Sequence, residues 1–177
     1  MKITGQFVPH LIQMLRSPAY RVLSLSGHRI LARIEIEHAD HGGRDNGKLP
    51  VTFADLVAYG ITDRHSIAHA IHEVCALGFV ELTRPGRAGG GEYRSPNLYR
   101  LTYLPSYGKP PTHEWRMIET VEEARRLVRK CSRASKKRSR GKKFTSGGIH
   151  TVAGVESTPL LSRFRGIQRC GNHTTSR

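Results

Sequence analysis

Residues 48–103 read KLPVTFADLVAYGITDRHSIAHAIHEVCALGFVELTRPGRAGGGEYRSPNLYRLTY, and the order of patterns in this stretch decides the fold. An alternating run at 49–53 predicts a short strand, and Thr52 is placed to cap a helix that stops at Gly60. We expect that helix to bury its apolar side chains, Phe53, Leu56 and Val57.

A second helix, at 64–77, has the sharpest periodicity in the chain. Thr62 or Asp63 can cap it, and Gly78 is a plausible stop. One face carries apolar residues at helical spacing: Ile67, Ala70, Ile71, Val74 and Leu77. The opposite face carries polar ones: His65, His69 and His72, with Arg64, Ser66 and Glu73 beside them. An apolar stripe beneath a polar one is what a helix lying in a DNA groove requires.

The two alternating runs after this helix, at 79–83 and 98–103, predict a hairpin. The connection at 84–97 is too polar and too rich in glycine to be core, and it fits a flexible tip. A strand, two helices and a hairpin in this order are the plan of a winged helix-turn-helix. The sequence therefore predicts an α+β fold of this kind, with a two-stranded wing, a C-terminal helix and a disordered basic tail.

The flanking segments complete the predicted organisation. Residues 1–16 form an N-terminal docking segment, and the winged-helix domain spans 17–104. Its first helices are expected at 18–25, capped by Ser17, and then from a cap at Ser26 to the Gly42-Gly43 pair. The prolines of residues 105–119 predict a linker, and the capping box Thr120-Val-Glu-Glu123 predicts a helix at 120–132. Residues 133–177 form a basic low-complexity tail that we expect to be disordered.

Charge divides the chain into two unequal parts. Residues 1–124 contain 14 Lys and Arg against 13 Asp and Glu, a balance of +1. Residues 125–177 contain 15 Lys and Arg against Glu156 alone, a balance of +14. A nearly neutral domain with a strongly basic arm indicates a nucleic-acid partner, or less often an anionic membrane surface. No run approaches the ~20 apolar residues of a spanning helix, so we expect no membrane partner.

The strings NGKLPVTFADLVAYGI, RHSIAHAIHEVCALGFVEL, GRAGGGEYRSPNLYRLTY and PPTHEW together resemble small winged-helix proteins of bacteria. These occur especially in alphaproteobacteria, often on plasmids or integrated elements, and are similar to the N-terminal DNA-binding domains of plasmid and phage replication initiators. The resemblance spans residues 7–130. It implies the fold and a double-stranded DNA partner, and a role in transcription regulation or replication initiation on a mobile element.

Three groups of residues are candidate nucleic-acid contacts. The first is the polar face of the second helix: Arg64, His65, Ser66, His69 and His72. The second is the wing, where arginines surround glycines that let the backbone approach closely: Arg84, Arg87 and Arg94. The third is the basic arm: Arg125, Arg126, Arg129, Lys130, Arg133, Lys136, Lys137, Arg138, Arg140, Lys142 and Lys143.

Other chemistries are less well supported by the sequence. His65, His69 and His72 lie at i, i+4 and i+7, and two of them could share a zinc ion, but the HExxH arrangement is absent and no cofactor is predicted. No nucleophile or acid/base set suggests an enzyme. The three cysteines are odd in number and far apart, and no secretory signal precedes the domain, so we expect a cytoplasmic protein, on the nucleoid if bound to DNA. Cys75 lies among apolar residues and is expected in the core.

A second function class remains open. Many winged-helix domains bind other proteins, so this chain could be a protein-interaction module. Its basic arm would then bind RNA or a membrane surface. A homodimer is also open, and the helix at 120–132 is the only candidate dimer element.

Overall fold

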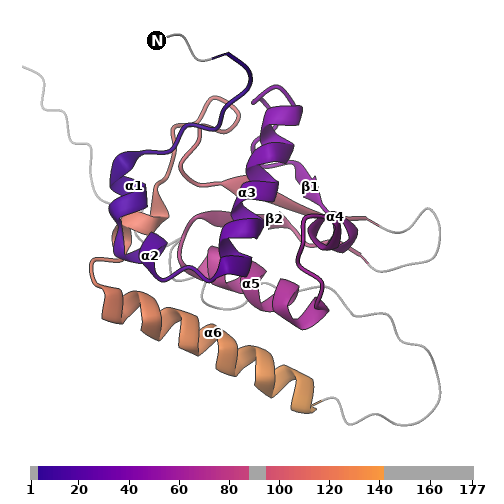
Figure 1. The fold of residues 1–177 in the computed structure, drawn as a ribbon, viewed down its shortest axis with the longest axis vertical. Coiled ribbons are helices and arrows are strands. Elements are labelled where there is room, and N and C mark those ends of the chain that lie inside the picture. The colour runs from indigo at the N-terminus through magenta and orange to yellow at the C-terminus, as the bar shows by residue number, and fades with distance from the viewer. Residues whose placement is uncertain (1–3, 88–94, 142–177) are drawn as a thin grey trace, which may run out of the picture.

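The computed structural model describes residues 4–87 and 95–141 (Figure 1). The fold is mixed α+β, with helices packed on a small antiparallel sheet. Its elements are α1 (Ile12–Arg16), α2 (Pro18–Arg21), α3 (Leu25–Asp40), β1 (Leu49–Val51), α4 (Phe53–Ala58), α5 (Arg64–Ala76), β2 (Val80–Arg84), β3 (Asn97–Leu101), the 3-10 helix η2 (Glu114–Met117) and α6 (Val121–Gly141).

The sheet has the order β1-β3-β2, and both pairings are antiparallel. The predicted hairpin is confirmed as β2 and β3, with Val80 opposite Leu101 and a register shift between Leu82 and Arg84. The predicted strand after residue 48 is confirmed as β1, which pairs with β3 through Leu49 and Tyr99. β1, which precedes α4 and α5 in the chain, is therefore the third strand of the sheet and lies beside β3 on the side opposite β2.

α3 and α5 pack against each other and supply much of the core. All five residues of the predicted apolar face of α5 are buried, so that prediction is confirmed. Glu73 of α5, which is 1% exposed, accepts hydrogen bonds from the amide of Ser24 at 2.7 Å and from its hydroxyl at 2.6 Å. These bonds fasten α5 to the start of α3, because Ser24 is also the residue that caps α3 through the amide of Gly27.

Two expectations about the first forty residues need correction, and a third segment, expected to dock, contains a helix that was not predicted. The cap of α3 is Ser24 rather than Ser26, because the carboxylate of Glu73 holds Ser24 in place. α2 ends at Arg21 instead of continuing to residue 25. Residues 12–16 form the helix α1, whose Met14 is fully buried, so the N-terminal segment is part of the packed unit.

α4 begins at the predicted residue, but fewer of its apolar side chains are buried than the sequence predicted. Thr52 and Asp55 form a capping box, which confirms the predicted cap. Leu56 is buried as expected, but Phe53 is 36% exposed and Val57 is 43% exposed. The helix has six residues, so a single apolar position can face α3 and α5, and the other two remain in contact with solvent.

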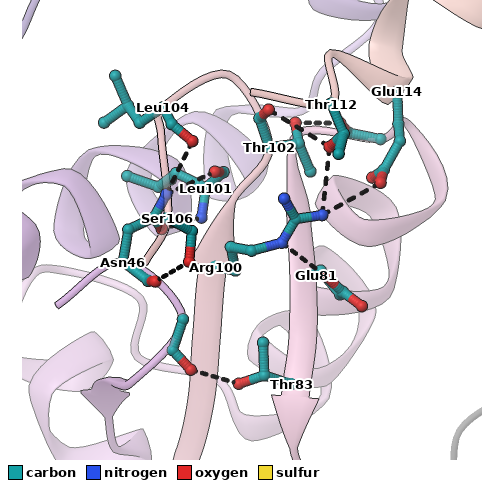
Figure 2. Close-up of polar contacts among 12 residues, drawn as sticks. Asn46, Glu81, Thr83, Arg100, Leu101, Thr102, Leu104, Ser106, Thr112 and Glu114 are labelled. Atoms are coloured by element: carbon teal, nitrogen blue, oxygen red, sulfur yellow. Dashed lines mark hydrogen bonds and ion pairs between the residues drawn. The ribbon is translucent and has the colours of Figure 1, made fainter. Parts of the chain in front are cut away.

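Residues 105–119 do not act as a free linker. Trp115 and Ile118 join the hydrophobic core, because η2 folds back onto the domain. Figure 2 shows two polar anchors for this return: Asn46, which lies close to Ser106, and Arg100, which donates to Glu81 at 2.7 Å and Glu114 at 3.2 Å. The buried side chain of Asn46 also donates to the carbonyls of Leu101, Leu104 and Pro105. The predicted boundary at residue 104 therefore falls inside one packed unit.

α6 is longer than predicted. The sequence predicted helix at 120–132, whereas the helical backbone runs from Val121 to Gly141 and includes residues 133–141, which were expected to be disordered. The predicted cap is present, since the hydroxyl of Thr120 accepts from the amide of Glu123 at 3.1 Å. The remainder of the predicted tail, residues 142–177, lies outside the described residues.

Candidate nucleic-acid interface

The first turn of α5 is open to solvent. Asp63 caps the helix by accepting from the amide of Ser66 at 2.7 Å and from its hydroxyl at 2.8 Å. The hydrogen bond from the Ser66 hydroxyl, and next the one from its amide, hold the pKa of Asp63 below its ordinary value. Arg64, His65 and Ser66 are all exposed, but the hydroxyl of Ser66 is engaged by the cap. Arg64 and His65 are therefore the side chains of this turn that are best placed to contact a ligand.

The middle of the polar face of α5 is partly covered, and His69 lies against α6. His69 and His72 are only partly exposed, and the Nε2 atom of His69 is 2.5 Å from the hydroxyl oxygen of Ser132. That hydroxyl also donates to the carbonyl of Val128, one turn earlier in α6, at 3.1 Å. The five residues that were predicted to form one accessible helix face are thus divided between an open first turn and a covered middle.

α6 packs on both α5 and α2 through its apolar stripe. Ala124 is fully buried, and Leu127 and Val128 are partly buried against the core. In Figure 1, α6 runs beside α5 in the opposite direction. The sequence alone could not assign the partner of this stripe, because an apolar stripe indicates burial without indicating the surface that buries it.

The opposite face of α6 carries a row of exposed cations. Its members follow the helical period on the side away from α5: Arg125, Arg126, Arg129, Lys130 and Arg133. We call these five residues the cation row. At 1.5 Å per residue, the row extends roughly 12 Å along the helix axis. The sequence continues the same spacing with Lys136, Lys137 and Arg140 on helical backbone, with Arg138 between them; the side chains of residues 134–141 lie outside the described part of the structure.

The base of the wing also offers basic side chains. Arg84 and Arg87 are exposed, and the backbones of Arg87 and Ser95 form an isolated bridge across the hairpin. Gly86 is required at this point, because a Cβ atom there would lie 2.5 Å from the carbonyl oxygen of Ser95. Arg94, Lys142 and Lys143, which were also predicted as contacts, lie outside the described residues.

In the view of Figure 1, the base of the wing, the first turn of α5 and the end of α6 are directed to the same side of the molecule. Phosphate groups are bound by Arg and Lys side chains of this kind. Each of these three elements carries exposed cations among the described residues, namely Arg84 and Arg87, Arg64, and the cation row.

Other chemistry has less support in the geometry. In the described part of the chain, no group of three His, Cys, Asp or Glu side chains is placed to hold a metal ion. Cys75, which was expected in the core, is partly buried and packs against the core, and burial raises the pKa of its thiol to about 12. Within the described ranges, none of the helices combines the length and apolar character needed to cross a membrane.

Compared with protein-family models, with curated proteins and with solved structures, the chain matches none.

Proposed function

We propose that this protein binds double-stranded DNA through a winged helix-turn-helix domain. The observation that carries the proposal is the order β1-α4-α5-β2-β3 with the strand order β1-β3-β2, in which an antiparallel hairpin directly follows the second of two successive helices. In folds with this plan, one helix and the hairpin commonly contact adjacent parts of a duplex. The first turn of α5 and the arginines at the base of the hairpin would make these contacts.

Electrostatics support the same partner. Residues 1–124 are nearly neutral, and the excess of positive charge lies in the chain after them. This charge begins on α6, which packs directly on α5, so its first members lie on an element that adjoins the proposed interface helix. Such a distribution supplies affinity for phosphates without selecting a sequence, while selection falls to groups that reach base edges. The resemblance of residues 7–130 adds a role as a transcription regulator or replication-initiation factor of a mobile element, acting in the cytoplasm.

A selection from random duplex oligonucleotides tests the proposal. The full chain is used at moderate salt, because salt suppresses sequence-independent phosphate binding. Enrichment of a motif is the expected result, and a palindromic motif would add dimerisation. The double variant Arg64→Ala/His65→Ala should lose the motif while keeping general affinity. Binding of all duplexes alike by the wild-type protein would reject sequence-specific reading.

A second candidate function is that of a protein-docking module. It is favoured by apolar side chains that α4 and its end leave in solvent, since Phe53, Val57 and Tyr59 are 36%, 43% and 38% exposed. Under this alternative, replacing Phe53 and Val57 by serine would abolish capture of a protein partner, and Arg64→Ala/His65→Ala would change nothing.

A further inference from the structure

α6 lies where a duplex would have to lie if the outer face of α5 were read. The bond between His69 and Ser132 and the packing of α6 on α5 place a whole helix over the middle of that face. A helix with its side chains is roughly 10–12 Å in diameter, and the major groove of B-DNA is about 12 Å wide. The groove admits one helix, so His69 is held back from it by the diameter of α6.

α6 is built into the domain and is not a loosely attached cover. The side chain of Ala124 is fully buried in the same core as α3 and α5. Thr120 caps the helix, and Ile118, immediately before it, is 4% exposed. α6 contacts α2 as well as α5, so moving it aside would break two interfaces and open the core.

From these observations we propose that α6, through its cation row, is the helix that faces duplex DNA on this side of the molecule, and that α5 reads DNA only with its first turn. The proposal rests on the DNA-binding function proposed above. α6 stays packed on α5, and its cation row is exposed to solvent on the opposite face. The row of Arg125, Arg126, Arg129, Lys130 and Arg133 lies entirely on the exposed side of α6.

A DNA duplex fits this row better than structured RNA does. An exposed helix with cations along one face can enter or straddle the wide major groove of B-DNA. The major groove of A-form RNA is deep and too narrow for side chains to read.

The first test compares two triple variants of the full chain with equal loss of charge. The row variant replaces three cations of α6: Arg126→Gln, Arg129→Gln and Lys130→Gln. The matched control replaces three exposed cations on other parts of the surface: Arg16→Gln, Arg44→Gln and Lys109→Gln. Binding to one duplex is measured over a range of salt concentrations, and circular dichroism checks that both variants are folded.

The row variant should bind all duplexes more weakly and reduce the slope of log K against log salt by about 2 to 3, since each phosphate contact contributes about 0.9. The control should change the slope by less than one. Equal slopes for the two variants would overturn the proposal, because affinity would then depend on total charge and not on α6. A row variant that loses an RNA hairpin and keeps the duplex would overturn it in favour of RNA.

The second test asks whether α6 stays in place. Ser132→Ala removes the hydrogen bond to His69 and leaves the cation row intact. If α6 is a fixed part of the surface, affinity for the duplex stays within twofold of wild type. If α6 must leave to expose α5, weakening its attachment raises the open fraction, and affinity rises about fivefold, the factor that corresponds to one hydrogen bond. Tighter binding would therefore reject the proposal.

Two different results would reject DNA binding itself and the role of α6 alone. Wild-type protein that binds no duplex at any salt concentration rejects DNA binding itself, and the inference with it. Wild-type binding that survives in the row variant and is lost in His69→Ala/His72→Ala rejects only the role of α6.

Discussion

At the residue scale, a few buried polar side chains connect segments that are distant in sequence. Glu73 connects α5 to the start of α3, and Asn46 connects the turn before β1 to the end of β3. Glu35, 5% exposed, accepts from the hydroxyl of Tyr103 and lies 2.6 Å from Nε2 of His10. Each of these groups is buried, so each needs its partners to offset the loss of water.

Asn46→Ala should lower the free energy of unfolding by about 3 kcal/mol, because the buried amide and carbonyl of Leu101 and the partly buried carbonyls of Leu104 and Pro105 lose their partner. Urea titration followed by circular dichroism measures the change. Gln13→Ala is the control: this exposed side chain accepts one long bond, at 3.3 Å, from Arg116, and its loss should cost less than about 0.5 kcal/mol. A similar stability for the two variants would contradict the role given to Asn46.

Two partly buried histidines predict a loss of stability in mild acid. Burial lowers the pKa of His28 and of His38 below the ordinary value of 6.5, although Glu73 and Asp45 respectively act in the opposite direction. The unfolded chain therefore binds more protons than the folded chain below pH 6.5, and stability falls as the pH decreases through that range. Urea titrations at pH 8.0, 6.5 and 5.5 should show the decline, and His28→Gln/His38→Gln should make it shallower. An unchanged pH dependence in the double variant would assign the decline to other groups.

At the element scale, caps and tight turns fix where each helix begins and ends. Thr52 and Asp63 cap α4 and α5, as the sequence predicted from their positions before apolar runs. Gly78 follows α5 with φ +75°, a left-handed conformation that side chains disfavour. Because it has no Cβ atom, Gly78 also lets η2 approach the end of α5. The same residue is therefore needed for the turn and for this contact.

Gly78→Ala should be strongly destabilising, by about 3 kcal/mol or more, because the added Cβ atom would lie 2.7 Å from the amide nitrogen of Trp115 and 2.8 Å from the carbonyl carbon of Glu114. Gly42→Ala is the matched control. Gly42 has φ +63° and nothing within 4 Å of its added Cβ, so only the conformational cost of about 1 kcal/mol remains. Thermal unfolding of both variants separates steric contact from backbone preference, and equal losses would argue against close approach of η2.

At the scale of the whole molecule, segments that looked peripheral belong to one packed unit. α1, η2 and the first half of α6 all contribute to the same core as the sheet and α5, through Met14, Trp115 and Ala124. α6 changes what the molecule presents to a partner, because it covers the middle of α5 and directs the cation row outward.

A chain that ends at Glu119 should therefore be less stable than one that ends at Gly141. Removing α6 uncovers apolar surface that Ala124, Leu127 and Val128 otherwise cover, which we expect to cost roughly 2 to 4 kcal/mol. The chain ending at Gly141 should retain the preferred DNA motif, with weaker salt dependence because six cations are absent. Equal stability of the two truncated chains would show that α6 adds nothing to the core.

Local pattern was sufficient for the three strands, for the starts of α4 and α5 and for the buried face of α5. Capping residues, the alternating strands and the period of Ile67, Ala70, Ile71, Val74 and Leu77 all act over a few residues, so they can be recognised without knowledge of the fold. The uneven distribution of charge was equally evident, because it depends on composition alone.

Only the tertiary structure decided which faces meet. The histidines of α5 and the apolar stripe of α6 were both visible in the sequence, yet nothing local indicated that Ser132 would lie against His69, 63 positions away. Proline-rich composition likewise suggested a linker at 105–119, and Asn46, Arg100 and Trp115 hold that segment on the domain. Such pairings depend on the shape complementarity of distant segments, and burial of an apolar stripe is favourable against any surface that excludes water.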